Sequence, residues 1–503
     1  MKLNNLILGL EITEFKGDSS LDLEGLTCDS RKIKKNFLFV AIRGFKEDGH
    51  RFIPQAIQRG AKAIVVEREV ENLPEGITLI KVPSSRIALA RLSNNFYGFP
   101  SREIRLIGVT GTDGKTTTTY LIESILKKAG FKVGRISTID YSLGDKIYLS
   151  SRTTPESVDL ERMLRTMVNK HCDYGIIEVS SHSLVLHRVE GVEFDIAVFT
   201  NLSRDHLDFH KTMSNYLEAK ASLFRNLEKC SKKETPKIAV VNIDDSAGRY
   251  IMSNVSCKVV TYGMKDKGCI RGKVIKSTPF GISFLLTAPE RIEINLSLLG
   301  IHNVYNALAA TSVALEEGVN LYSIKKGLEE VRRIPGRLEF IENNQNLNIF
   351  VDYAHTPEGL RRVLQTLKEV TKGRLMVVFG CGGERDKEKR PLMGEVALMK
   401  ADYSIITSDN PRSEDPQKII EEIEEGIKRR GGREGKDYLK IKDRKEAIKK
   451  AIQMMKDGDV LLVAGKGHEK VQIFKERVIK FNDREVIQEI LNSKGKDERN
   501  FFY

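Results

Sequence analysis

Residues 104–119 read IRLIGVTGTDGKTTTT, and this stretch decides the fold. Residues 104–109 form an apolar run typical of a buried strand, and a short loop with two glycines follows it. A helical pattern then extends to Lys128 and stops before Gly130, a residue type that often ends helices. Strand, glycine loop and helix in this order predict a phosphate-binding α/β unit.

The residue types in the loop suit a nucleotide. Gly111 and Gly114 can bring bare backbone N–H groups against phosphate oxygens, at the N-terminus of the following helix. The charge of Lys115 can reach the β- and γ-phosphates, and the hydroxyl of Thr116 suits Mg²⁺. We therefore expect a P-loop that binds the phosphates of ATP together with Mg²⁺.

Further apolar runs lie on both sides of this stretch and alternate with helical patterns. Such alternation is typical of parallel sheets that helices cover on their faces. The runs lie at residues 37–42, 63–66, 78–82, 174–179, 196–199, 238–241, 347–352, 374–379, 403–407 and 459–464. With a Pro-Gly linker at residues 334–340, they predict an α/β protein of three domains. We expect an N-terminal substrate domain at 1–100, a central P-loop ATPase-like domain with a parallel sheet at 101–335, and a Rossmann-like C-terminal domain at 336–503.

The bulk composition limits the class of protein. The 503 residues are 40% hydrophobic and 30% charged, as in a soluble globular chain. The apolar runs are far shorter than the roughly 20 residues of a membrane span, and the N-terminus lacks the features of a signal peptide. The six cysteines form no CxxC pair, which fits a reducing compartment. We therefore expect a cytoplasmic protein without membrane insertion.

The net charge is +13, from 82 basic and 69 acidic residues. The basic residues are spread along the chain, and no nucleic-acid reader motif accompanies them. A basic surplus also suits a pocket for polyanionic small molecules. The sequence therefore favours an anionic small-molecule substrate and no nucleic acid.

Two residues predict a metal site near the phosphate loop, and a lysine further along the chain has helical spacing. Glu178 ends the run at 174–179, and His206 follows the next run in TNLSRDHLDFH, at the strand ends where open α/β sheets bind ligands. Lys220 stands three residues after Leu217 and four before Phe224, on an apolar helix face. Burial there would lower its pKa and make the amine reactive. From the residues alone, a structural histidine and a snorkelling lysine stay possible.

The loop at residues 111–117 resembles the GTNGKTT loop of the Mur ligases, and the resemblance extends over almost the whole chain. It implies that Lys115, Glu178, His206 and Lys220 are catalytic, and that Lys220 is N-carboxylated. By the same resemblance, Mg²⁺ is held by Thr116 and Glu178, and a second ion by His206 and Lys220. GIHNVYNALAA, PGRLEF and VDYAHTP match ATP-binding segments of the family, although HNVYNALAA on its own reads simply as a helix start. The implied ATP contacts are Gly111, Thr112, Asp113, Gly114, Lys115, Thr116, Thr117, Asn303, Arg337, Asp352 and His355.

The N-terminal motifs TCDSRKI and LFVAIRGFKEDGHRFI resemble the uridine-binding domain of the branch of this family that adds the third peptide residue. TTPE at residues 153–156 also matches that branch. The resemblance implies that the acceptor is UDP-N-acetylmuramoyl-L-alanyl-D-glutamate. The implied contacts are Ser30, Thr153, Thr154, Ser180 and Arg188.

The C-terminal segments CGGERDKEKRPLMG, SDNPRSEDP and AGKGHE carry the predicted amino-acid specificity. DNPR resembles the mark of members that add meso-diaminopimelate. This substrate has one carboxylate more than lysine, and the guanidinium of Arg412 can bind it by two parallel hydrogen bonds. An unpaired arginine would disfavour lysine. The other implied contacts are Arg385, Asp409, Asn410, Pro411, Gly465 and Glu469. Taken alone, DNPR also reads as a turn with a solvent-facing arginine.

Three positions depart from the expected patterns. Val109 stands where the strict phosphate-loop motif has glycine, and Asp113 replaces the usual asparagine of the family loop. Leu186 stands where many relatives carry glutamine, which removes one hydrogen bond expected to the acceptor. The negative charge of Asp113 is expected to face Mg²⁺ or a lysine.

The expected reaction is an ADP-forming ligation that joins meso-diaminopimelate to the D-glutamate γ-carboxylate through an acyl phosphate, in a monomeric enzyme of peptidoglycan precursor synthesis. A lysine-adding ligase of the same family is the close alternative. A folylpolyglutamate synthase shares the loop, but DSR, TTPE and DNPR speak against it. From another class, a P-loop ATPase that remodels a partner stays possible.

Overall fold

The computed structural model describes residues 1–45, 47–229, 233–265 and 268–497. It confirms the predicted α/β class with parallel sheets. The chain forms two compact units, of which the first combines Met1–Ile270 with Leu308–Ile324 and the second Arg271–Ala307 with Lys325–Tyr503. Cys230 lies outside the described residues, and the five other cysteines carry free thiols.

The first unit begins with a five-stranded sheet in the order β1-β5-β4-β3-β2. Only β1 runs antiparallel to its neighbour. The strands are β1 (Glu14–Lys16), β2 (Gly25–Thr27), β3 (Phe37–Val40), β4 (Ala61–Val66) and β5 (Thr78–Lys81). Alternate strand residues face opposite sides. Leu38 and Val40 therefore pack with α3 (Ser85–Tyr97), whereas Phe39 packs with α2 (Ile53–Gln58).

The rest of the first unit is built on a second sheet, in which strands occur in the order β13-β12-β11-β6-β10-β7-β8-β9. All are parallel except β8 and β9, which form a hairpin at one edge. The strands are β6 (Arg105–Thr110), β7 (Val133–Ile136), β8 (Asp140–Leu143), β9 (Lys146–Leu149), β10 (Tyr174–Glu178), β11 (Ile196–Phe199), β12 (Ile238–Asn242) and β13 (Lys258–Gly263). The central strands are buried on both faces, as covered parallel sheets require.

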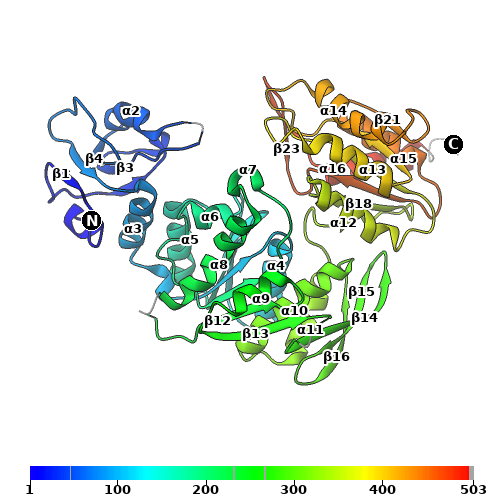
Figure 1. Cartoon of the computed structure of the whole chain (residues 1–503), viewed down its shortest axis with the longest axis horizontal. Helices are drawn as coiled ribbons and strands as arrows, with labels where there is room; N and C mark the ends of the chain where they lie inside the picture. Colours follow the sequence, from blue (N-terminus) through cyan, green and yellow to red (C-terminus); the bar gives the residue numbers. More distant parts are fainter. Residues whose placement is uncertain (46, 230–232, 266–267, 498–503) are drawn as a thin grey trace. The chain divides into compact units, whose positions relative to one another are not determined.

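Helices connect these strands, as Figure 1 shows. They are α4 (Lys115–Lys128), α5 (Ser157–Asn169), α6 (Ser181–Val185), α7 (Leu207–His210), α8 (Met213–Lys229) and α9 (Ser246–Met252). The boundary between the two units falls within α10 (Ile301–Glu316) and α11 (Leu321–Glu330). β6, the phosphate loop and α4 follow each other as predicted, and α4 ends at Lys128 before Gly130.

The second unit starts with an antiparallel meander that the sequence did not reveal, β14 (Ile270–Thr278), β15 (Gly281–Thr287) and β16 (Arg291–Leu296). A six-stranded sheet follows in the order β17-β18-β22-β19-β20-β21 and is parallel except for β17. Its strands are β17 (Glu339–Phe340), β18 (Asn348–Asp352), β19 (Leu375–Phe379), β20 (Tyr403–Ile406), β21 (Tyr438–Lys440) and β22 (Val460–Ala464).

Both faces of this sheet are covered, so the predicted Rossmann-like arrangement is confirmed (Figure 1). Val377 and Leu462 pack against the helices α12 (Pro357–Lys368), α13 (Lys389–Lys400) and α14 (Pro416–Arg429). Val378 and Leu461 pack on the opposite face, against α15 (Arg444–Met454) and α16 (Asp483–Asp497). A small hairpin, β23 (Val471–Ile473) and β24 (Val478–Lys480), follows β22.

None of the helices in the described ranges combines the length and the apolar character that crossing a lipid bilayer requires.

Candidate functional site

The phosphate loop is held in a conformation that depends on glycine. Gly111 has a φ of +150°, and a Cβ atom there would lie 1.8 Å from Oγ1 of Thr200, so no side chain fits. Lys115 is the first residue of α4, and its Nζ donates to the carbonyl oxygens of Gly111 (3.1 Å) and Thr112 (2.8 Å). The predicted residues therefore form a compact loop at a helix N-terminus, where backbone dipoles favour an anion.

Two residues that the sequence analysis did not select hold the loop in place. The backbone N–H of Asp113 donates to Oδ1 of Asn201 (3.0 Å). Its carbonyl oxygen accepts from Oγ1 of Thr200 (2.7 Å) and from Nδ2 of Asn201 (3.1 Å). Both residues open the TNLSRDHLDFH segment directly after β11, and this place at a strand end was the signal that could have identified them.

Thr116 and Glu178 come together as predicted. The hydroxyl of Thr116 donates to Oε2 of Glu178 (2.9 Å), and both side chains are buried. The same carboxylate oxygen accepts from the backbone N–H of Thr138 (3.0 Å). No group of three or more histidine, cysteine or acidic side chains that could hold a metal ion occurs in the described part of the chain. A hydroxyl and a single carboxylate nevertheless fit Mg²⁺, which proteins usually bind by one or two carboxylates together with substrate phosphates.

Lys220 lies at the phosphate loop rather than at the surface. Its side chain is buried, its Nζ donates to the carbonyl oxygen of Gly111 (2.6 Å), and the ammonium lies 4.3 Å from the ring centre of Tyr216. The snorkelling alternative is therefore wrong. Burial, with the nearby charge of Lys115, holds the pKa of Lys220 well below its ordinary value. A neutral amine at this position is a nucleophile.

His206 sits at the start of α7 with a φ of +52°. Its ring lies 4.8 Å from that of His182 and 6.2 Å from that of Tyr216, the residue that Lys220 also contacts. His206 is exposed, and its Nε2 lies 3.3 Å from Oδ2 of Asp205, so its role as a metal ligand stays a prediction beside that of a structural histidine. His206 and Lys220 thus both lie near the ring of Tyr216.

Four of the five predicted acceptor contacts lie together beside Glu178. Thr154 donates to the carbonyl oxygen of Glu178 (2.7 Å) and accepts from the backbone N–H of Ser180 (3.1 Å). Arg188 donates to the carbonyl oxygen of Thr154 (3.2 Å) and pairs with Glu156.

Thr153 joins the same group because its Oγ1 accepts from Thr138 (3.0 Å), whose backbone N–H binds Glu178. Ser30 is the fifth predicted contact and lies elsewhere, in the N-terminal sheet region, where it donates to Gln55 (2.7 Å). Leu186, at the position of a usual glutamine, is buried. The acceptor residues thus form one group at the second sheet and one single position in the first.

In the second unit, the residues predicted to bind the amino-acid substrate lie together where β20 and β22 end. Nδ2 of Asn410 donates to Oε2 of Glu469 (2.7 Å). Gly465 has a φ of +111°, and a Cβ atom there would lie 2.7 Å from Oδ2 of Asp409, so the glycine lets this carboxylate approach the backbone. These residues meet although they come from two distant segments.

Arg412 and Arg385 flank one glycine. Nη1 of Arg412 donates to the carbonyl oxygen of Gly383 (2.7 Å), and a Cβ atom at Gly382 would lie 3.0 Å from that nitrogen and 3.7 Å from Cγ of Arg385. Arg412 is half-buried with a φ of +52°, so it is not the solvent-facing arginine of a simple turn. The guanidinium of Arg412 suits a carboxylate, and the stem of Arg385 lies beside it.

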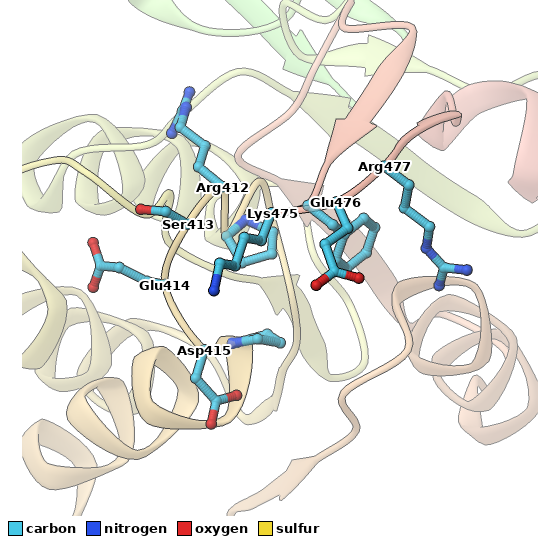
Figure 2. A pocket seen from close by; sticks show the side chains of 10 residues that line it. Arg412, Ser413, Glu414, Asp415, Lys475, Glu476 and Arg477 are labelled. Atoms are coloured by element: carbon cyan, nitrogen blue, oxygen red, sulfur yellow. The ribbon is translucent and has the colours of Figure 1, made fainter.

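A cavity of about 500 Å³ is lined by residues 411–416, which include Arg412, and by residues 474–477. Figure 2 shows Arg412 pointing away from Asp415 and Lys475 in this cavity. Nη1 of Arg412 is instead hydrogen-bonded to the carbonyl oxygen of Gly383.

The remaining predicted ATP contacts lie in the second unit. Asp352 accepts from the backbone N–H groups of Leu338 (2.6 Å) and Ala354 (2.7 Å). Asn303 is buried in α10 and donates to the carbonyl oxygen of Leu299 (2.8 Å), so the predicted helix start is confirmed. Arg337 and His355 both lie against the ring of Tyr353. Arg337, Asp352 and His355 thus lie in or beside the short segment that follows β18.

Three segments of the chain match known sequence families. Residues 22–97 match the Mur ligase family catalytic domain, residues 109–314 the Mur ligase middle domain, and residues 336–467 the Mur ligase glutamate ligase domain. These matches confirm the predicted three-domain architecture, and the boundaries at 100 and 335 stay predictions.

Full-length relatives carry one common name. A UDP-N-acetylmuramoyl-L-alanyl-D-glutamate–2,6-diaminopimelate ligase from Caldanaerobacter subterraneus subsp. tengcongensis is 45% identical over 497 residues, which are 99% of this chain and 100% of the relative. A ligase of the same name from Geobacillus thermodenitrificans is 44% identical, with 97% and 98% covered.

Solved structures agree with these matches. A ligase with the same name superposes with a TM-score of 0.66 at 30% identity and covers 98% of this chain and 99% of its own. A MurF ligase from Thermotoga maritima in complex with ADP has the same fold, with a TM-score of 0.63 at 21% identity and 94% and 98% covered.

Proposed function

The chain belongs to the Mur ligase family, and from this membership we propose that it is the ATP-dependent ligase that joins meso-diaminopimelate to UDP-N-acetylmuramoyl-L-alanyl-D-glutamate. The relatives at 43–45% identity over their full length are named for this reaction. The structural observation that supports the choice of amino acid is the half-buried guanidinium of Arg412, which the carbonyl oxygen of Gly383 orients beside Gly382. It suits the second carboxylate of diaminopimelate, which lysine lacks.

In the first step, the γ-carboxylate of D-glutamate attacks the γ-phosphorus of ATP. A new O–P bond forms, the bond to the β-γ bridging oxygen breaks, and ADP leaves with its electron pair. The backbone of the phosphate loop and the ammonium of Lys115 would stabilise the charge on the transferred phosphoryl group. Thr116 and Glu178 are the residues that would hold Mg²⁺, which neutralises phosphate charge when bound.

In the second step, an amine of diaminopimelate attacks the acyl carbon, and the tetrahedral intermediate expels inorganic phosphate as the amide forms. The amine gives up its proton in this step. Arg412 and Arg385 would orient the amino acid by its distal carboxylate, and Glu469 would pair with an ammonium. This chemistry needs charge neutralisation and positioning rather than a protein nucleophile.

The other assignments belong to the same proposal. ATP is the co-substrate, bound by residues 111–117 together with Asn303, Arg337, Asp352 and His355. Lys220 acts as N-carboxylated lysine and holds a second Mg²⁺ together with His206. The protein works as a cytoplasmic monomer in peptidoglycan precursor synthesis, without a nucleic-acid partner.

Phosphate release by the purified protein tests this proposal. Each of ATP, the UDP-linked acceptor and diaminopimelate is left out in turn, with Mg²⁺ present throughout. Release that needs all three supports the ligase. Brisk release with ATP alone would overturn it in favour of an ATPase that acts on a partner.

A further inference from the structure

Lys466 is a fully buried lysine beside the predicted contacts of the amino-acid substrate. It lies in the AGKGHE segment after β22, with none of its side chain exposed. Its Nζ donates to Oε2 of Glu469 (2.8 Å), to Oδ1 of Asn410 (3.1 Å) and to the carbonyl oxygen of Val471 (2.7 Å). An ammonium has three hydrogen atoms, so these bonds satisfy it completely.

The amide of Asn410 is held by both of its ends. Its Oδ1 accepts from Lys466 and from the backbone N–H of Ile473 (3.0 Å), while its Nδ2 donates to Glu469 (2.7 Å). Since two donors face one end of the amide and a carboxylate faces the other, only one orientation of this side chain satisfies all partners. Asn410 therefore serves to place Glu469.

Strand β23 completes the arrangement. The carbonyl oxygen of Val471 accepts from Lys466, and the backbone N–H of Ile473 donates to Asn410. In addition, the backbone N–H of Arg412 donates to the carbonyl oxygen of Ile473 (3.0 Å). Lys466, which follows β22, thus forms hydrogen bonds with both the DNPR segment and β23.

We propose that Lys466 is the positioning residue of the amino-acid site: its ammonium fixes Glu469 and Asn410 and balances the charge of the Glu469 carboxylate. This inference rests on the proposed function of the same site. Both bonds to Glu469 end on Oε2, so Oε1 is the oxygen left to receive an ammonium of the amino acid. Lys466 itself does not touch the substrate and acts through Glu469.

The test measures KM for diaminopimelate and for ATP in Lys466→Met and Lys466→Gln. Losing a hydrogen bond to a charged group predicts a rise of about ten- to hundredfold in KM for diaminopimelate in Lys466→Met. KM for ATP should change less than about twofold. Lys466→Gln keeps an N–H donor and should fall between Lys466→Met and the wild type, and it decides the question if the methionine variant does not fold.

Ile452→Ala is the matched control. Ile452 is buried in the same unit on α15, close to Met454, whose carbonyl oxygen accepts from Arg374 just before β19. It therefore lies near the end of the sheet opposite the amino-acid contacts. This variant should lower thermal stability without a selective rise in KM for diaminopimelate.

A double variant that combines Lys466→Met with Glu469→Gln tests whether Lys466 acts through Glu469. If Lys466 acts through Glu469, the double variant should resemble Glu469→Gln alone instead of multiplying the two losses. Three outcomes would overturn the inference while leaving an active ligase. They are a double variant whose rise in KM is the product of the two single rises, equal rises in KM for diaminopimelate and ATP, and lower thermal stability without a selective rise in KM for diaminopimelate, as in Ile452→Ala. A wild-type protein without turnover on diaminopimelate would overturn the proposed function itself, and the inference with it.

Discussion

Nζ of Lys220 lies 2.6 Å from the carbonyl oxygen of Gly111, so a lysine of helix α8 contacts the backbone of the phosphate loop. The two residues are 109 positions apart in the chain. A charged ammonium in this buried place would face the like charge of Lys115, and this repulsion adds to the cost of burial. The contact therefore favours a neutral amine next to the place where phosphates are expected.

The neutral amine of Lys220 is expected to add CO₂. Its nitrogen forms a bond to the carbon of CO₂ and releases one proton, which leaves a carbamate. Protein treated with ¹³C-bicarbonate should show one carbamate signal in its NMR spectrum, and activity should fall when CO₂ is removed. Lys220→Arg, whose guanidinium stays protonated, should lack both the signal and the dependence. A signal of equal size in that variant would assign the carbamate to another lysine.

Lys115→Ala should lower kcat by about a hundredfold or more, because it removes a positive charge from the phosphate loop. Steady-state phosphate release measures the effect. Lys127→Ala, at the other end of the same helix and half exposed, serves as the control and should retain activity near that of the wild type. Near-normal turnover of Lys115→Ala would refute the role of this loop.

Arg412→Ala should raise KM for diaminopimelate by about ten- to hundredfold and leave KM for ATP nearly unchanged. The physical reason is the loss of the guanidinium that Gly383 orients. Arg429→Ala, an exposed arginine paired with Glu425 on α14, is the control. Equal increases in both KM values would contradict a specific contact with the amino acid.

Glu161 predicts a pH dependence of stability. It is fully buried in α5, no donor among the described residues reaches either of its oxygens, and burial raises its pKa from 4.5 to about 8. The folded protein therefore keeps this proton at a pH where the unfolded chain has lost it. Below pH 4.5 both states hold the proton, and this carboxyl costs the folded state nothing. As the pH rises from 4.5 to about 8, the free energy of unfolding falls, by on the order of 3 kcal/mol at pH 7.

Glu161→Gln should remove this dependence. The variant should match the wild type at low pH and be more stable at pH 7 to 8, because the amide cannot ionise. Urea unfolding at several pH values measures the difference. Parallel stability profiles for the two proteins would show that Glu161 is ionised in the folded state.

The sequence predicted the elements that are locally encoded. Strand β6, the glycine loop and the end of α4 at Lys128 follow from short apolar and glycine patterns. Glu178 and His206 were proposed from their positions at strand ends, and most other candidate site residues from the family resemblance. The meander β14–β16 was missed because an exposed face interrupts its apolar pattern, as in IRGKVIKST of β14.

Contacts between distant segments could not be predicted. Lys466 and Asn410 are 56 residues apart, and nothing in AGKGHE distinguishes a buried lysine from an exposed one. Asn201 holds the phosphate loop from another strand end in the same way. Such roles become visible only when the fold brings the partners together.

The most direct test of the ligase assignment is a competition between two amino acids. Purified protein receives Mg²⁺, ATP and UDP-N-acetylmuramoyl-L-alanyl-D-glutamate with equal amounts of meso-diaminopimelate and L-lysine, and mass spectrometry identifies the UDP-linked product. We predict that the diaminopimelate product strongly dominates. A product that carries lysine would contradict the role of Arg412, and the absence of any ligated product would contradict the assignment as a whole.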